Sequence, residues 1–178
     1  MTDAIVPRDV SQLHAVINAL YCLRFQCGIA VSAELAQAVD GLATQLLLAG
    51  CTDEVVLLVV ASDLTDAEAL RTIVPNLGSD GQASRNTIEL TFAMIGMARL
   101  RQQVAWNAKS LEDVYYFVSS CAVDDDLGQL THLLNVLWSY ELTPGARYID
   151  ECEAAAVAKL LDHTFDAKRS VLSKYGLE

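Results

Sequence analysis

Apolar residues recur at three- and four-residue steps along almost the whole chain, the spacing that places side chains on one face of an α-helix. The first stripe consists of Leu13, Ile17, Leu20 and Leu23. It predicts a helix over residues 8–26, which Pro7 opens and Gly28 closes. A second stripe consists of Leu35, Val39, Leu42 and Leu46. It predicts a helix that begins with Ser32 as its N-cap and ends at Gly50.

Residues 52–62 are ambiguous, because their run of aliphatic side chains from Val55 to Val60 suits either a buried strand or a buried helix. Thr52, Asp53 and Glu54 are typical of a helix start, since acidic side chains favour the positive end of the helix dipole. The sequence offers no second convincing strand for pairing. We therefore predict a helix here.

The later segments continue the helical pattern. Thr65-Asp66-Ala67-Glu68 matches a capping box and predicts a short helix that stops before Pro75. The helix predicted over residues 85–107 is apolar on nearly every face between Ile88 and Ala98, which is typical of a central helix. Three further helices are predicted over residues 110–121, 127–137 and 146–174.

These elements predict an all-α, single-domain fold over residues 1–178, a mixed or orthogonal bundle of about seven or eight helices. The chain has 178 residues, of which 53% are hydrophobic, and only 3 prolines and 9 glycines interrupt it. That composition favours a packed domain over a disordered tail or linker.

No membrane association is expected, because no apolar run approaches the roughly 18–20 residues of a membrane span. The first residues lack the basic start and apolar stretch of a secretory signal. The 5 cysteines are odd in number and form no CxxC pair, which disfavours a secreted disulfide framework. Cys22 and Cys27 are five apart, so we expect them to share a helical face poorly. We predict a cytoplasmic protein.

The net charge is −11, and it is unevenly distributed. Residues 1–84 carry 3 basic and 10 acidic side chains, a balance of −7. Residues 110–178 carry 5 basic and 12 acidic side chains, also −7. Residues 85–109 carry 4 basic side chains and 1 acidic one, a balance of +3. Such an acidic chain is repelled by nucleic acid and by anionic membranes at long range.

The basic middle segment is therefore the candidate nucleic-acid site, with Arg85, Arg99, Arg101 and Lys109 as its residues. Arginine forks near an aromatic side chain such as Trp106 suit a phosphate or a single strand. The alternative is that these cations pair with acidic side chains on neighbouring helices, within one subunit or between subunits. The overall charge favours this alternative.

Signals for catalysis or metal binding are weak. Asp124, Asp125 and Asp126 are consecutive, so they point in different directions on a helix and are explained by the helix start. His163 lies beside Asp162, but a surface ion pair explains that arrangement better than acid–base catalysis. The sequence contains no Glu-x-x-His pair, P-loop, GxGxxG, GxSxG or HExxH motif. We expect no metal and no cofactor, and we lean against an enzyme.

Aromatic side chains exceed what the predicted core stripes use. The candidate interface residues are Tyr115, Tyr116, Trp138, Tyr140 and Tyr148. Aromatic residues left over after the core is filled are typical of interface anchors. Self-association is the simplest way to cover this excess, so we expect a protein partner that includes other copies of the chain.

Short landmarks over residues 52–107 loosely resemble the coat proteins of flexuous filamentous plant viruses. These landmarks are Thr52-Asp53-Glu54-Val55, Ser84-Arg85, Leu100-Arg101-Gln102 and Trp106-Asn107. The resemblance implies an all-helical core that grips RNA with a serine and an arginine. The later aromatic–aspartate motif of that family has no clean counterpart here, because Tyr115-Tyr116-Phe117 lacks the aspartate.

The sequence thus predicts a non-enzymatic helical assembly or adaptor protein that acts through protein contacts and self-associates. One alternative is a nucleic-acid-packaging, coat-like subunit that uses residues 85–109. Another is a small-ligand-binding protein or enzyme with a pocket inside the bundle.

Overall fold

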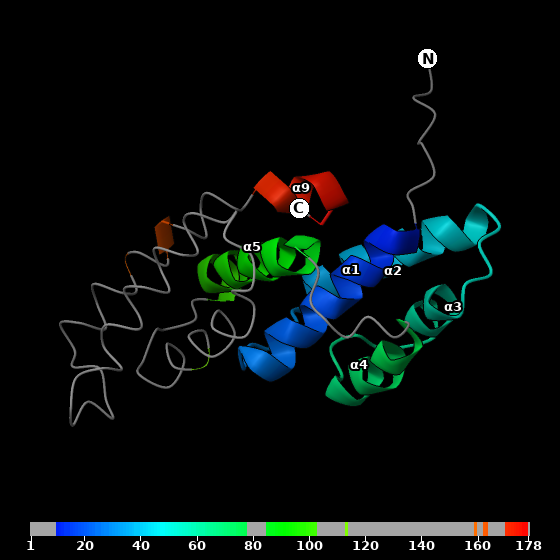
Figure 1. Ribbon diagram of the computed structural model, residues 1–178, viewed down its shortest axis with the longest axis horizontal. Helices are drawn as coiled ribbons and strands as arrows, with labels where there is room; N and C mark the ends of the chain where they lie inside the picture. Colours follow the sequence, from blue (N-terminus) through cyan, green and yellow to red (C-terminus); the bar gives the residue numbers. More distant parts are fainter. Residues whose placement is uncertain are drawn as a thin grey trace, which may run out of the picture.

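The computed structural model describes residues 10–77, 85–102, 113, 159, 162–163 and 170–177. Every regular element within these ranges is a helix, and the same ranges contain no strand (Figure 1). The predicted all-α fold is therefore confirmed. The predicted number of helices involves residues outside the described ranges.

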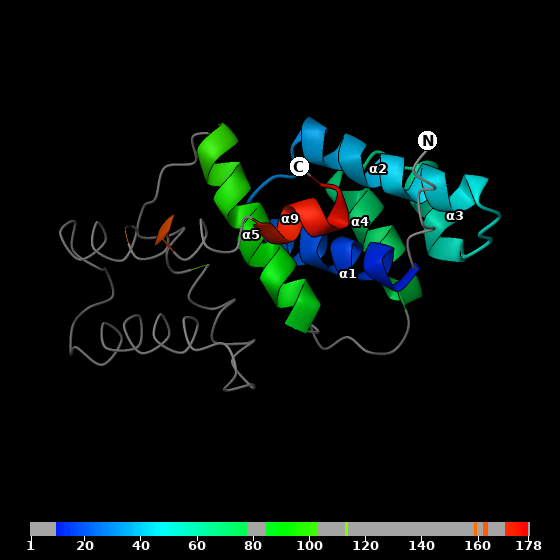
Figure 2. The same cartoon turned by 90° about the horizontal axis from the view of Figure 1, so that it is seen from above.

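Helix α1 (Val10–Tyr21) is the element around which the others pack. It contacts α2 (Ala33–Leu48), α3 (Glu54–Val60), α4 (Ala67–Ile73) and α5 (Arg85–Gln102). Figure 2 shows α5 crossing α1 on one side, with α2 on another. Leu13, Ile17 and Leu20 are buried, as the first apolar stripe predicted.

The last predicted turn of the first helix is a π-helix, η1, over Cys22–Gln26. Its wider turn lets the N–H of Cys27 donate to the carbonyl of Cys22, five residues earlier, at 3.0 Å. We expected these two cysteines to share a helical face poorly, yet both are buried. Both thiols enter the core, with 6% of Cys22 and 2% of Cys27 exposed. Gly28 then ends the helix with a φ of +69°, as predicted.

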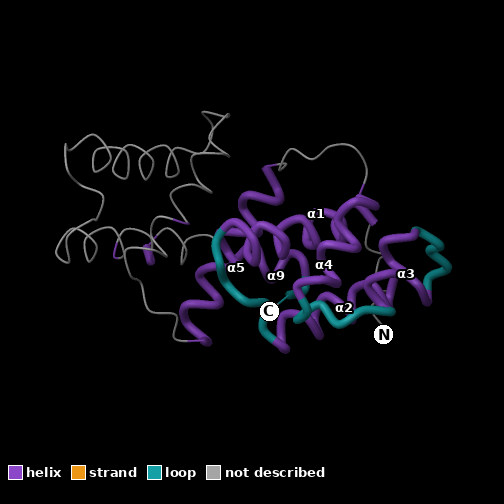
Figure 3. The backbone as a smooth tube through the Cα atoms, turned by 90° about the horizontal axis from the view of Figure 1, so that it is seen from below, coloured by secondary structure: helices purple, strands orange, loops and turns teal. Residues whose placement is uncertain are grey.

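Helices α2 and α3 form a hairpin, and both predicted ends of α2 are confirmed. The Ser32 hydroxyl accepts from the N–H of Leu35 at 3.2 Å, and Gly50 follows the helix with a φ of +87°. The ambiguous run at 52–62 is a helix, with Asp53 as its N-cap. The connection between α2 and α3 lies at the opposite end of the described part from α5 (Figure 3).

The capping box predicted at Thr65 was wrong by one residue. Asp66 is the N-cap of α4, and its side chain accepts from the N–H of Glu68 at 3.0 Å. Thr65 instead donates its hydroxyl to Asp63 at 2.7 Å, because that carboxylate lies two residues earlier in the same turn. The α-helix stops at Ile73, before Pro75 as predicted, and a 3-10 turn, η2 (Val74–Leu77), carries the chain onward.

Helix α5 is central, as its apolar surface predicted. All side chains from Thr87 to Ala98 are buried except the half-buried Glu89. The hydroxyl of Thr91 donates to the carbonyl of Thr87 at 2.7 Å, so this polar group is satisfied inside the core. Helix α9 (Ser170–Tyr175) packs on α5. Burial, and then the nearby charge of Glu89, raise the pKa of Tyr175 above its usual value.

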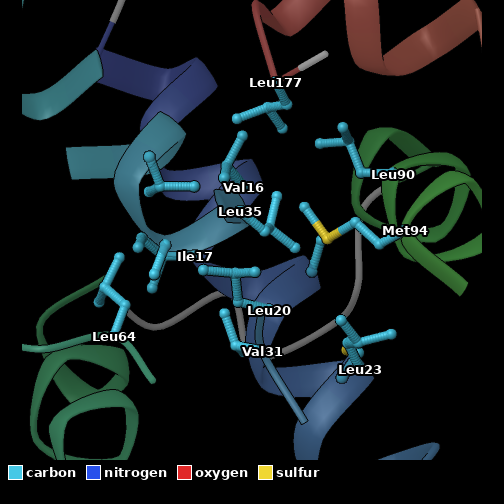
Figure 4. Packing of buried hydrophobic residues seen from close by; sticks show 14 of the residues in the cluster. Val16, Ile17, Leu20, Leu23, Val31, Leu35, Leu64, Leu90, Met94 and Leu177 are labelled. Carbon is cyan, nitrogen blue, oxygen red and sulfur yellow. The ribbon is translucent and has the colours of Figure 1, made fainter. Parts of the chain in front are cut away.

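The core lies where α1, α2 and α5 converge. Figure 4 shows side chains from these helices packed together, and Leu177 belongs to the same cluster. The labelled residues include Val16, Ile17, Leu20, Leu35, Leu90 and Met94. Each is 2% exposed or less.

Gly28 provides a test of this packing, because it combines a positive φ with a close neighbour. A Cβ at this position would lie 3.3 Å from Oδ2 of Asp113. We expect Gly28→Ala to lower the free energy of unfolding by about 1–2 kcal/mol, the cost of a left-handed backbone for an L-residue. Urea denaturation measures this change.

Two other glycines are the controls. Gly50 has a φ of +87° but nothing within 4 Å of its Cβ position, so Gly50→Ala reports the backbone cost without the contact. Gly41 lies inside α2 with nothing within 4 Å, and Gly41→Ala should stabilise by about 0.5–1 kcal/mol. An unchanged stability of Gly28→Ala would contradict the described geometry.

Candidate functional site

The structure describes only part of the set of residues that the sequence predicts to bind nucleic acid. Arg85 opens α5, and Arg99 and Arg101 belong to its last turns. The side chains of these three arginines lie outside the described part, and so does Lys109. Their role stays a prediction.

The predicted interface aromatics also lie outside the described ranges. They are Tyr115, Tyr116, Trp138, Tyr140 and Tyr148. Their contribution to self-association therefore stays a prediction as well.

The described histidines do not form a catalytic or metal site. His163 is exposed, and His14 pairs with Asp53. Within the described ranges, no group of three or more His, Cys, Asp or Glu side chains is arranged to hold a metal ion. Asp124, Asp125 and Asp126 lie outside these ranges.

A small, largely apolar hollow lies between η1, the segment before α2, the start of α2 and α5. Its volume is about 10 Å³, which is about the room that a single water molecule needs. The lining residues are Leu23, Ala30, Ser32, Leu35, Met94, Met97 and Ala98. The one polar side chain among them, Ser32, already caps α2.

The distinctive feature of the described part is instead a set of exposed apolar side chains on the α2–α3 hairpin. Three large apolar side chains are exposed there: Leu48 by 83%, Leu57 by 47% and Val60 by 37%. Leu48 ends α2, while Leu57 and Val60 are three apart on α3 and so share one side of that helix. The opposite side of α3 is buried through Val55, Val56 and Val59. We call Leu48, Leu57 and Val60 the hairpin face.

Sequence reasoning missed this face, although a signal for it exists. Six consecutive aliphatic residues in a helix span all directions around its axis, and a short helix packed on one side leaves some of them in water. The run from Val55 to Val60 therefore implies exposed apolar positions once it is known to be helical. While the choice between strand and helix was open, the sequence alone did not indicate exposed apolar positions here.

The hairpin face lies in a part of the chain that is acidic throughout. Between Arg24 and Arg71 there is no lysine, arginine or histidine. The acidic residues in that stretch are Glu34, Asp40, Asp53, Glu54, Asp63, Asp66 and Glu68. Arg71, the first cation after the stretch, lies 4.8 Å over the ring of Phe25 and also pairs with Glu68. The stretch of chain that carries the hairpin face is therefore negatively charged.

Asp53 holds the start of α3 in place, and Asp63 orders the turn that follows the helix. Asp53 Oδ1 accepts from the N–H of Val55 at 2.9 Å and lies 3.3 Å from Nε2 of His14, so it ties the start of α3 to α1. Asp63 Oδ1 accepts from the N–H and hydroxyl of Thr65, at 2.9 and 2.7 Å. These hydrogen bonds lower the pKa of Asp63. A face mounted on a fixed helix loses little conformational entropy when a partner binds.

Opposing effects act on the pKa of the Asp53 carboxyl group. Burial by itself raises its pKa, but the hydrogen bonds from His14 and Val55 and the charge of His14 outweigh burial, so the pKa lies below its usual value. The charged form is the one that caps α3. Its contribution to folding is therefore complete above the pKa of the unfolded chain and is lost as the pH falls through the folded pKa.

Comparison with known proteins adds no relative: no protein-family model, curated protein or solved structure matches this chain. Within the described ranges, no helix has the length and apolar character needed to cross a membrane. The candidate site consequently rests on the geometry of the hairpin alone.

We expect Asp53→Asn to lower the free energy of unfolding by about 0.5–1 kcal/mol at neutral pH, because the amide oxygen still accepts from the N–H of Val55 while the carboxylate that faces His14 is lost. Asp53→Ala should cost about 1–2 kcal/mol, because it removes the cap as well. The deficit of Asp53→Asn should shrink below about pH 4, where Asp53 in the unfolded wild type begins to take up its proton. Urea denaturation at several pH values measures both effects, and a deficit of Asp53→Asn that is constant down to pH 2 would contradict them.

Proposed function

We propose that this chain is a non-enzymatic helical assembly or adaptor protein whose function is to form protein contacts, including contacts with copies of itself. The single observation that carries the protein-contact role is the hairpin face, whereas self-association rests on the aromatic residues counted from the sequence. Monomeric proteins expose scattered apolar residues, but here all three large ones in the described part come from one hairpin of two contacting helices.

The anchored start of α3 supports the same proposal. The Asp53 side chain caps the first turn of the helix and contacts His14 of α1. Apolar side chains on a fixed helix are suited to binding a preformed partner, whereas apolar side chains on a mobile loop must first be ordered.

The remaining features fit a binding role better than a catalytic one. His163 is exposed and lies outside the hollow, while the hollow itself offers one polar side chain that is already in use. Catalysis requires convergent polar groups in a cleft. The odd number of cysteines, two of them packed as thiols in the core, supports a cytoplasmic location.

Self-association is tested by the mass of the protein in solution. We expect light scattering at about 50 µM, where interfaces of micromolar Kd are populated, to give a mass above that of one chain. The double variant Trp138→Ser/Tyr140→Ser should return the mass to one chain, because it removes two of the predicted aromatic anchors. Circular dichroism of the variant verifies that it remains folded.

A matched pair of variants separates the aromatic residues from the hairpin face. Leu57→Ser/Val60→Ser removes the same number of apolar side chains from α3. We expect this variant to keep the wild-type mass. A wild-type mass of one chain throughout the concentration series would contradict self-association.

A further inference from the structure

The hairpin face has a charge pattern that restricts what binds to it. Leu57 and Val60 form a short apolar stripe along α3, and Glu54 lies one turn before Leu57 on the same side of the helix. Asp63 and Asp66 follow shortly after the helix ends. Glu54, Asp63 and Asp66 are all exposed. Along the chain, exposed carboxylates therefore precede and follow the apolar stripe.

The basic side chains described near this surface already have partners. His14 faces Asp53, and Arg71 faces Glu68 and the ring of Phe25. Neither pair includes the carboxylates that border the stripe. A partner that buries the stripe must therefore supply positive charge next to its own apolar side chains.

Pairing of this face with the same face of a second copy is disfavoured. A two-fold contact would bring Glu54, Asp63 and Asp66 of one copy against the same three residues of the other. Such a contact would place like charges together at the rim of the apolar contact, which opposes binding. The hairpin face is suited to a chemically different surface.

The length of the stripe indicates the shape of that surface. Helix α3 has 7 residues and spans about 10 Å at 1.5 Å per residue, about two turns of a partner helix. A helix with apolar residues at i, i+3, i+4 and i+7 covers such a stripe. Lysine or arginine at its flanks then reaches Glu54 at one end and Asp63 at the other.

We propose that the hairpin face binds a cationic amphipathic helix of another protein, with its apolar side on Leu57 and Val60 and its cations on Glu54, Asp63 and Asp66. This proposal rests on the proposed function, because it names the partner class of an interaction domain. It differs from the self-association step, which is assigned to the aromatic residues. The two are tested by different measurements.

The test uses a fluorescent 14-residue helical peptide made of leucine and lysine, with leucine at i, i+3, i+4 and i+7 spacing, and follows its anisotropy on titration with the full chain. We expect saturable binding that weakens as salt is added. Leu57→Ser should weaken binding about fivefold, since roughly half of this side chain is still available for burial. A peptide of the same composition in scrambled order, and one with glutamate in place of lysine, should bind much less.

Charge variants locate the binding surface. Glu54→Gln/Asp63→Asn should weaken binding and flatten its salt dependence, while the amide that replaces the Asp63 carboxylate keeps an oxygen for Thr65. The matched control, Glu34→Gln/Asp40→Asn, changes the net charge equally on α2 and should bind as the wild type does. Equal effects of the two double variants would overturn the proposal, because binding would then follow net charge alone.

Three further outcomes separate this proposal from the proposed function. Absence of peptide binding in a chain that self-associates would overturn the partner assignment and leave the assembly role standing. A drop to the mass of one chain in Leu57→Ser/Val60→Ser would show that a second copy occupies the face, which also overturns the assignment. Absence of both peptide binding and self-association would overturn the interaction role itself.

Discussion

Burial of α1 is the interaction on which the described structure depends. Its side chains Leu13, Val16, Ile17 and Leu20 are excluded from water by helices that approach from several sides. Burial of apolar area is the main favourable contribution to folding. Each surrounding helix is therefore held mainly by the apolar surface that it buries on α1 and on neighbouring helices. Polar contacts such as that between His14 and Asp53 fix the register of these helices but contribute less.

This arrangement explains why the apolar surface left over is on α3. Helix α3 is short and lies against α1 and α2, so only the side bearing Val55, Val56 and Val59 reaches the core. Leu58 is partly buried against the core, whereas Leu57 and Val60 remain exposed among the described residues. Helix α3 is capped and tied at its start, and the chain around it is acidic. Its exposed apolar side chains therefore have the features of a recognition surface. The charge beside them restricts which partners can bind.

Local features of the fold were predictable because their causes lie within a few residues. The cap at Ser32 and the helix ends at Gly28 and Gly50 depend on one side chain or one backbone conformation each. The shift of the α4 cap from Thr65 to Asp66 shows the limit of this reasoning. Asp63 competes for Thr65 within the same turn, and the pattern of the capping box contains no information about that competitor.

The candidate site was less predictable than the fold. Sequence reasoning chose aromatic and basic residues from about 85 onward, whereas the described surface that stands out is aliphatic and lies on the hairpin. Aliphatic residues are expected in cores, so a run such as Val55 to Val60 does not signal a surface. Only the packing of α3 on one side distinguishes Leu57 from Val56.

By itself, the sequence determined the helical class, most helix ends and the buried stripes, since periodicity and capping act over one or two turns. The tertiary structure decided the rest: the π-helical turn that brings Cys22 and Cys27 into the core, and the sides of α2 and α3 that face water. Exposure depends on which distant segments cover a residue. That is a property of the packed arrangement and not of any local pattern.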